Sequence, residues 1–156
     1  MLAELVAEGK LPPVEERLPE QPGICPVQEM NGKYGGIMRR GYTGVSDRTG
    51  PNKMQECSLT WFNPDLTMRT EMAESWAINE DASEWTFKLR PGTKWSDGSP
   101  FTSAAFTWYW ENVLKNKELT ASPPRNWSTG NPLVLGELEA PDDFTIVLKF
   151  TDPNPL

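Results

Sequence analysis

The chain has 156 residues, of which 37% are hydrophobic and 24% are charged, a globular composition that excludes wholesale disorder. Its apolar runs are short and its mean hydropathy is -0.56, which excludes a membrane-spanning helix of about 20 apolar residues. The net charge of -7 is opposite in sign to the basic surface that a nucleic-acid backbone requires, so nucleic acid is not expected as a partner.

The chain contains no histidine, which removes the commonest general base near neutral pH and the commonest metal ligand. Cys25 and Cys57 lie 32 positions apart with no second cysteine beside either, so neither a zinc site nor a redox CxxC motif can be built from them. Glycine motifs that bind phosphates or dinucleotides are absent as well. We therefore expect no enzyme, no cofactor and no metal. The cysteines permit one disulfide without requiring it, because nothing in the sequence places their segments side by side.

The first 30 residues contain five prolines and mostly acidic charges. This composition predicts an extended arm on the surface, after a first helical turn or two that ends near Val6. No basic region followed by an apolar stretch opens the chain, which indicates either a cytosolic protein or a mature chain without its signal peptide. Between residues 31 and 50, six glycines coincide with basic charges around a predicted strand, Gly36 to Tyr42. That region is either a strand with flexible ends or a ligand-facing loop held by a rigid strand.

The middle of the chain is predicted as short elements separated by turn residues. Residues 57–62 predict a short strand or turn, which Asn63-Pro64-Asp65 closes. Residues 71–76 predict a single helical turn, and a short strand follows around Ala77-Ile78. An acidic turn at 79–81 then ends this part.

Two segments carry the clearest strand pattern. Residues 85–90 and 144–150 both alternate apolar and polar side chains, the period of a half-buried strand. The turn at Asp142-Asp143 brings the second segment back, beside the first. With residues 36–42 they are expected to contribute to a small, mainly antiparallel sheet.

One helix is predicted, over residues 103–115, after the tight-turn sequence Asp97-Gly98. Thr102 or Ser103 can cap its first turn, and apolar side chains recur along it every three or four residues. The helix should pack on one face of the sheet, which makes the fold α+β. The predicted core consists of Phe87, Leu89, Phe106, Trp110, Ile146 and Leu148.

Seven tryptophans, all between Trp61 and Trp127, are more than a core of this size needs. Trp85 and Trp110 have the phase of core residues. Trp61, Trp108 and Trp127 could instead form a surface on which a sugar ring or a peptide side chain stacks. For Trp127 the alternative is that its ring folds back onto the core.

The order of the segments resembles the signature of family 5 extracellular solute-binding proteins, the dipeptide-, oligopeptide- and nickel-binding components of ABC importers. The resemblance rests on Ala73-Glu74-Ser75-Trp76 before an acidic turn, on the run from Trp85 to Gly92, and on the run from Lys94 to Thr102. Residues 9–20 and 32–36 resemble a long-arm branch of the family. Two departures are that Ala105 stands where the family usually has an acidic residue, and that family members are several-fold longer.

The resemblance implies a two-lobed periplasmic binding protein fold, of which this chain would be an N-terminal fragment. Residues 1–30 would be the arm and residues 31–156 the N-terminal part of the first lobe, with the second lobe absent. The implied function is capture of a peptide or related oligomeric solute and its delivery to a membrane permease, without covalent chemistry. The implied location is the periplasm or the cell exterior, with a lipoprotein anchor as one option. Whether the solute is a peptide, an oligosaccharide or a nickel complex stays open.

The resemblance also points to a binding site. It implies that the loop after the first strand, here with Tyr42 and Thr43, faces the solute, together with Trp61 and Trp127 from neighbouring irregular segments. The Tyr42 ring can stack while its hydroxyl makes one directional hydrogen bond; the alternative is that it ends a strand and packs on the core. A competing hypothesis is a self-contained carbohydrate-binding module that uses the exposed tryptophans.

Overall fold

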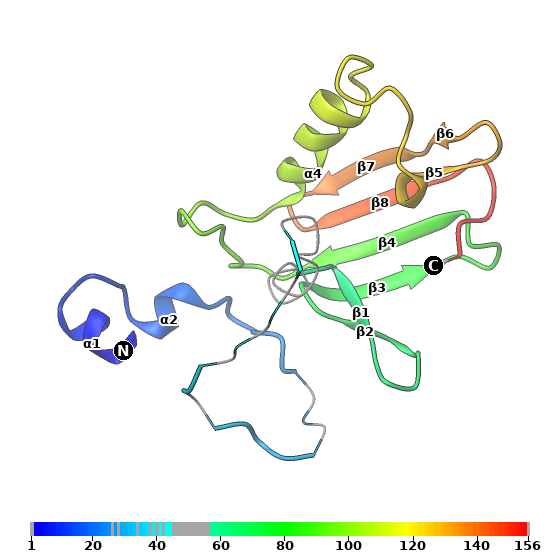
Figure 1. Cartoon of the computed structure of the whole chain (residues 1–156). Helices are drawn as coiled ribbons and strands as arrows, with labels where there is room; N and C mark the ends of the chain where they lie inside the picture. Colours follow the sequence, from blue (N-terminus) through cyan, green and yellow to red (C-terminus); the bar gives the residue numbers. More distant parts are fainter. Residues whose placement is uncertain are drawn as a thin grey trace.

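The computed structural model describes residues 2–25, 27, 29–33, 35–37, 39, 41, 43–44 and 57–155. Within these ranges no helix has both the length and the apolar character to cross a membrane. Two short helices, α1 (Leu2–Ala7) and α2 (Val14–Arg17), lie in the arm, apart from the sheet (Figure 1). The first matches the predicted opening turns, whereas the second was not predicted.

A four-stranded antiparallel sheet forms the centre of the fold (Figure 1). Its strands are β3 (Ala73–Ile78), β4 (Glu84–Leu89), β7 (Glu137–Asp142) and β8 (Thr145–Lys149), in the order β3-β4-β8-β7. The two clearest predicted strands are therefore the two central ones. They lie side by side as expected, with Trp85 opposite Leu148 and Phe87 opposite Ile146.

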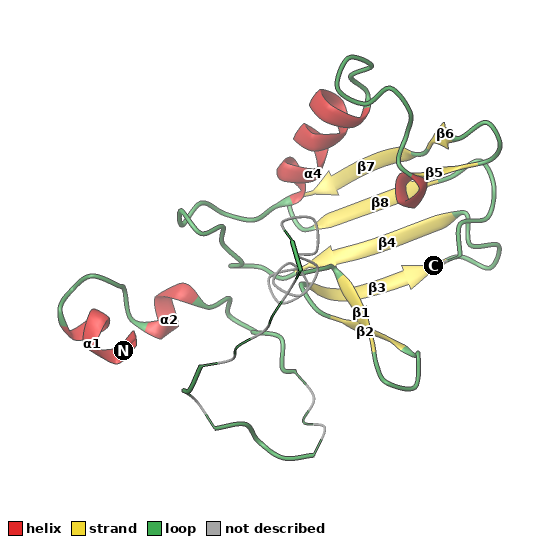
Figure 2. Ribbon diagram, viewed as in Figure 1, coloured by secondary structure: helices red, strands yellow, loops and turns green. Residues whose placement is uncertain are grey.

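Smaller elements surround the sheet. The hairpin β1 (Thr60–Phe62) and β2 (Met68–Thr70) contacts β3, and β5 (Ser128–Thr129) pairs with β6 (Val134–Leu135). Helix α4 (Ser103–Tyr109) contacts β7 and β8 and continues as a π-helical turn from Trp110 to Leu114 (Figure 2). The structure is thus α+β with small antiparallel sheets, as predicted.

The core lies on the sheet face that carries Trp85, Phe87 and Ile146, and the helix covers part of it. Ile146 is 0% exposed and Leu89 and Leu114 are 1% exposed. Phe106 is partly buried against this cluster, and the other five predicted core residues are buried. The alternation in 85–90 and 144–150 was sufficient to identify the buried face.

Three turns share one local design, in which Oδ1 of an aspartate accepts hydrogen bonds from the main-chain N–H and the hydroxyl two residues later. They are Asp65-Leu66-Thr67, Asp81-Ala82-Ser83 and Asp97-Gly98-Ser99. Their middle residues have left-handed φ values of 67°, 58° and 88°. The hydroxyl bond, and then the N–H bond, hold the pKa of each aspartate below its usual value. All three lie where the sequence predicted turns.

Two predicted elements are wrong. The described residues of the predicted strand 36–42 are not in a strand: Gly36 has a φ of 84°, which no strand allows, and Ile37 is 82% exposed. The predicted helical turn at 71–76 does not form: residues 73–76 are the start of β3, where Ala73 is 0% exposed and pairs with Leu89. Tertiary pairing overrides the local helical preference there.

Two further details differ from the sequence prediction. Neither Thr102 nor Ser103 caps α4 through its side chain; the Ser103 hydroxyl donates to the carbonyl of Asp142, at 2.8 Å. The first turn of the helix is therefore tied to the β7–β8 turn. Strand β7 was not predicted, because Pro141 and alternating acids disguise it, and only Leu138 of its residues is even partly buried.

Candidate functional site

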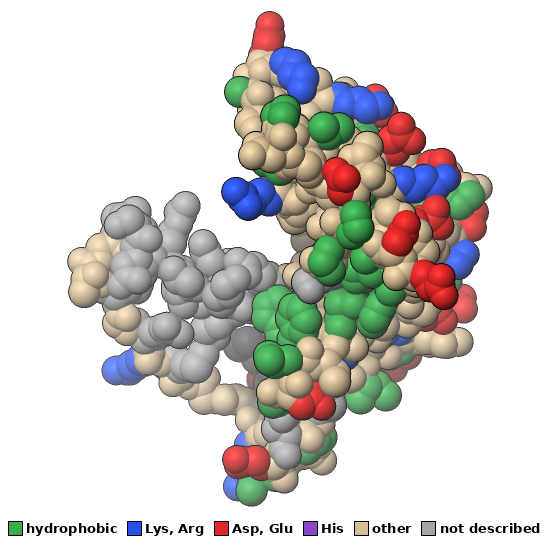
Figure 3. Space-filling view, turned by 90° about the vertical axis from the view of Figure 1, so that its right-hand side faces the viewer, with side chains coloured by type: hydrophobic (Ala, Val, Ile, Leu, Met, Phe, Trp, Pro, Cys, Tyr) green, Lys and Arg blue, Asp and Glu red, His purple; other side chains and the backbone are tan. Residues whose placement is uncertain are grey.

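Aromatic rings line the apolar face of the sheet. The Trp76 and Trp85 ring centroids are 5.8 Å apart, and Trp85 stacks with Phe87 at 6.0 Å. Trp76 is half-buried, so this row reaches from the core towards the surface. Figure 3 shows hydrophobic side chains gathered in the middle of one side of the molecule, with carboxylates and amines beside them.

The predicted site residues stand as follows. Tyr42 lies outside the described residues, and Thr43 is exposed. Trp61 is half-buried on β1, opposite Arg69. Trp127 is half-buried and packs edge-to-face on Trp110, with centroids 5.6 Å apart and planes at 87°. The expected alternative for Trp127, that it folds back onto the core, is what the structure shows.

Trp61 and Trp127 belong to different parts of the domain. The hairpin that carries Trp61 contacts β3, at one edge of the sheet. Trp127 packs on the helix that contacts β7 and β8, towards the other edge. Trp108, which lies on that same helix, is 62% exposed. The elements that carry Trp61 and Trp108 are thus separated by the width of the sheet, which does not support a single tryptophan platform.

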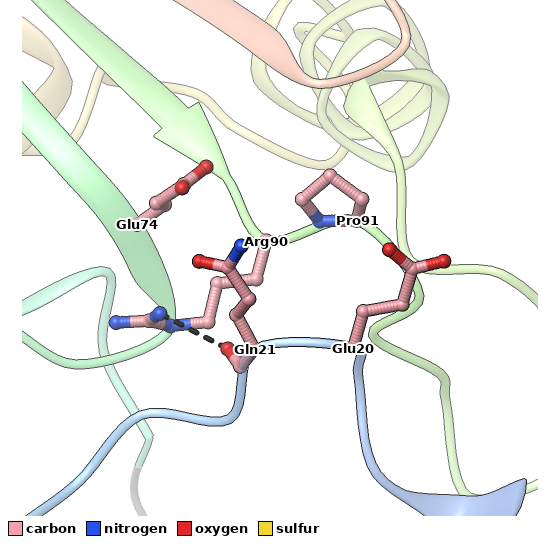
Figure 4. Close-up of a pocket in the computed structure, with 5 residues that line it drawn as sticks. All are labelled: Glu20, Gln21, Glu74, Arg90 and Pro91. Atoms are coloured by element: carbon pink, nitrogen blue, oxygen red, sulfur yellow. Dashed lines mark hydrogen bonds between the residues drawn. The ribbon is translucent and has the colours of Figure 1, made fainter.

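The arm meets the sheet at a small pocket (Figure 4). It is lined by Glu20, Gln21, Glu74, Arg90 and Pro91 and has a volume of about 70 Å³. Arg90 donates from Nη1 to the carbonyl of Gln21 at 3.2 Å and from Nε to the carbonyl of Glu71 at 3.4 Å. The guanidinium therefore joins the arm to the bend between β2 and β3.

A second cation extends this junction. Lys94 Nζ donates to the carbonyl of Glu16 at 2.8 Å. Gly92, with a φ of 79°, lies against Pro19, where an added Cβ would be 3.4 Å from the Pro19 Cα. The segment 90–94 is thus a dock for residues 16–21 of the arm, and it recognises main-chain carbonyls of the arm.

The pocket at this junction is too small for an oligomeric solute. Ligand sites for drug-sized molecules usually enclose about 300–1,000 Å³, whereas 70 Å³ holds a few waters. In the described part of the chain, no group of three or more Cys, Asp or Glu residues could hold a metal ion. The junction joins the arm to the sheet domain.

Sequence reasoning missed the roles of Arg90 and Lys94. Both lie inside the runs that carry the family resemblance, where Arg90 ends a predicted strand and Lys94 precedes the predicted Asp97-Gly98 turn. The sequence does contain a signal for these roles, because Arg90 and Lys94 flank Pro91-Gly92 and the arm is acidic. Their targets are main-chain carbonyls, however, and those leave no trace in side-chain composition.

Residues 67–156 match the sequence profile of the bacterial extracellular solute-binding proteins, family 5 Middle. This chain belongs to that family. The match covers more than half of the chain and includes β2, the four-stranded sheet and α4. The resemblance predicted from the three central sequence runs is therefore confirmed.

Relatives of the family 5 chain bind more than one class of solute. The periplasmic alpha-galactoside-binding protein of Rhizobium meliloti strain 1021 is 30% identical over 182 aligned positions, covering 97% of this chain and 25% of the relative. The periplasmic oligopeptide-binding protein OppA of Escherichia coli K12 is 33% identical over 97 positions, covering 54% and 17%.

Solved structures support the same assignment. An oligopeptide-binding protein OppA superposes with a TM-score of 0.84 at 37% identity, covering 98% of this chain and 24% of that one. The periplasmic binding protein MelB from Agrobacterium fabrum C58, in complex with stachyose, gives a TM-score of 0.61 at 26% identity over 97% and 26%. The chain spans about a quarter of the length of these two proteins and of the Rhizobium relative.

Proposed function

We propose that this family 5 chain is part of the solute-binding component of an ABC importer, which captures a peptide or related oligomeric solute and delivers it to a membrane permease. The observation that carries the proposal is the superposition on OppA, with a TM-score of 0.84 over 98% of the chain. The periplasmic names of the relatives support a location outside the cytoplasmic membrane. Residues 31–156 would then form the N-terminal part of the first lobe, with residues 1–30 as its arm.

The absence of covalent chemistry is part of the same proposal. The relatives are all named as binding proteins. Binding by lobe closure requires shape and hydrogen bonds, and needs neither a nucleophile nor a general base. The lack of histidine is consistent with that requirement.

Isothermal titration of the complete gene product tests the solute. Peptides of two to five residues and stachyose are titrated separately. Saturable binding of peptides alone supports the peptide assignment. The second candidate, an α-galactoside oligosaccharide, is favoured by the two carbohydrate-linked relatives that each cover 97% of the chain. Binding of stachyose without peptide binding would replace the first candidate by the second.

The proposed ligand contacts are Tyr42, Thr43 and Trp61, together with the part of the half-buried Trp127 ring that its packing on Trp110 leaves uncovered. In the complete protein, Tyr42→Ala should weaken solute binding by about 1–3 kcal/mol, because a buried ligand group loses its hydrogen-bond partner. The matched control is Trp108→Ala, an exposed aromatic on α4 outside the proposed site, which should leave affinity unchanged. Unchanged affinity together with a large fall in Tm for Tyr42→Ala would assign Tyr42 to the core instead.

A titration of the 156-residue chain tests the competing module hypothesis. A self-contained carbohydrate-binding module would show saturable quenching of tryptophan fluorescence with oligosaccharides. We expect weak or no quenching, because the chain spans about a quarter of the length of the relatives named above.

A further inference from the structure

The two cysteines end a segment whose ends are brought together by the fold. Cys25 and Cys57 are both free and exposed, and they lie 32 positions apart in the sequence. Nothing in the sequence relates them. In the structure, Gly23, two residues before Cys25, and Ser58, one residue after Cys57, lie on the two sides of one peptide group, the one that joins Glu71 to Met72.

The arm approaches this peptide group from its carbonyl side. A Cβ added to Gly23 would stand 3.2 Å from the carbonyl oxygen of Glu71 and 3.5 Å from two nitrogens of Arg90. Arg90 itself bonds the carbonyls of Glu71 and Gln21. Gly23 is two residues before Cys25, so this end of the segment lies against the bend between β2 and β3.

The start of the β1 hairpin approaches from the other side. The N–H of Met72 donates to the carbonyl of Ser58 at 3.0 Å, and the N–H of Ser58 donates to Oε2 of Glu71 at 2.9 Å. Ser58 is the neighbour of Cys57. Ser58 is thus hydrogen-bonded to this peptide group, and Gly23 lies against its carbonyl oxygen. The arm also meets the end of β4, where Arg90 donates to Gln21.

The remaining distance is within the reach of the chain. Each residue spans up to about 3.3–3.6 Å, and Cys25 is two residues from Gly23 and Cys57 one residue from Ser58. A disulfide requires Cα atoms about 4.4–6.8 Å apart. Both cysteines are exposed, so neither is held by burial in the core.

We propose that Cys25 and Cys57 form an intrachain disulfide when the protein is in an oxidising compartment, an inference that takes its compartment from the proposed function. One thiolate attacks the disulfide of an oxidant such as oxidised glutathione and releases one thiol. The thiolate of the other cysteine then attacks the resulting mixed disulfide and displaces the second thiol of the oxidant. The two cysteines lose two electrons and two protons in total, and the oxidant is reduced to two thiols.

The bond would close residues 26–56 into a loop anchored at both ends on one edge of the domain. Tyr42 and Thr43 lie in that interval. The disulfide would therefore tether the segment that carries two of the proposed ligand contacts, and it would fix the arm covalently to the β1 hairpin.

The test is thiol counting on the 156-residue chain. The chain is equilibrated with a glutathione redox buffer, quenched with acid, denatured and labelled with a maleimide polymer that shifts its gel mobility. We expect monomers with no labelled thiol after oxidation and two after reduction, and a tryptic peptide pair joined through Cys25 and Cys57. Cys25→Ser and Cys57→Ser should each keep one labelled thiol.

Disulfide formation in the native chain is compared with disulfide formation in the urea-unfolded chain. The difference shows whether the fold holds the two cysteines close together. The equilibrium constant against glutathione gives the effective concentration of one thiol near the other. It should be at least about tenfold higher in native buffer than in urea, and Arg90→Ala should lower the native value several-fold by releasing the arm. Equal values in native buffer and urea, or disulfides only between chains, would overturn the proposal. Since no solute is used, this outcome is independent of the titrations that test the solute.

Discussion

The arm and the sheet domain are held by different forces. From Glu20 to Met30, every described residue of the arm is exposed, whereas Leu89 of β4 and Ile146 of β8 are 1% and 0% exposed. Apolar burial stabilises the sheet and its helix. The arm is held by Arg90 and Lys94, which donate to its main-chain carbonyls. Side-chain substitutions should therefore be tolerated in the arm and not at its dock.

The family profile also covers the sheet domain and not the arm. The profile begins at residue 67 and runs through the sheet domain, so it contains the dock at 90–94 but not the arm that lies on it. A dock that binds carbonyls does not depend on the side chains of its partner segment. The sequence of the arm can then change while its attachment is kept.

The largest effect should come from the core of the sheet domain. Trp110→Ala should destabilise the chain by about 3–5 kcal/mol, because it leaves a cavity among Trp85, Phe87 and Ile146. Urea unfolding followed by circular dichroism measures the difference. Trp108→Ala, two residues earlier and 62% exposed, should change stability by less than about 0.5 kcal/mol. Similar losses for both variants would mean that the helix presents a different face to the sheet.

A close backbone approach should give the next largest effect. An added Cβ on Gly136 would stand 2.6 Å from the carbonyl oxygen of Lys149 and 2.9 Å from the Phe150 ring, so Gly136→Ala should cost about 1–3 kcal/mol. In the exposed segment that follows the arm, Gly32 has no atom within 4 Å of its added Cβ, and Gly32→Ala should leave the unfolding midpoint unchanged. A lower unfolding midpoint for Gly32→Ala would show that this segment is packed, which its exposure does not predict.

The aspartate turns predict effects of opposite sign. Gly98→Ala should destabilise by about 1–2 kcal/mol, because an L-residue is strained at a φ of 88°. Leu66, at a φ of 67° and 79% exposed, already bears such strain, so Leu66→Gly should stabilise by up to about 1 kcal/mol after the entropy of the unfolded chain is included. Thermal unfolding measures the change in Tm for each variant. A change of the same sign for both variants would contradict the argument from backbone strain.

Amide exchange under reducing conditions should separate the two regions directly. Residues 10–30 should exchange fast, since their prolines withhold donors and their attachment is through carbonyls, while β4 and β8 should exchange slowly. Arg90→Ala should raise proteolytic cleavage in the arm several-fold with little change in Tm, because an exposed hydrogen bond contributes only about 1 kcal/mol. Slow exchange through residues 10–30 would make the arm an integral part of the domain.

The smallest effect should be a dependence on pH. Each turn aspartate has its pKa lowered by the hydroxyl and N–H donors of its turn. A carboxyl whose pKa is lower in the folded state stabilises the fold fully when the pH is above its unfolded-state pKa. This stabilisation is lost as the pH falls through the folded-state pKa. The urea concentration at the unfolding midpoint should therefore decrease as the pH is lowered below about 4. Asp65→Asn with Asp97→Asn should flatten that slope, and an unchanged slope would assign the acid sensitivity to other groups.

The sequence predicted the turns and the central strands well, because both depend on local signals. The aspartate turns at 65, 81 and 97 use residues adjacent in the chain, and the alternation in 85–90 marks a face that is buried on one side only. The family could be predicted for the same reason, since its signature runs are these strands and turns. The site residues could not be tested to the same depth, as Tyr42 lies outside the described residues.

By itself the sequence determined that this is an α+β domain with a buried face on 85–90 and 144–150, an acidic arm and no histidine chemistry. Only the tertiary structure decided that residues 73–76 extend as part of β3, that Trp127 packs on Trp110, and that Arg90 and Lys94 hold the arm. The physical reason is the range of the interactions. Turns and alternation are set within a few residues, whereas strand pairing and bonds to distant carbonyls depend on partners up to 78 positions away.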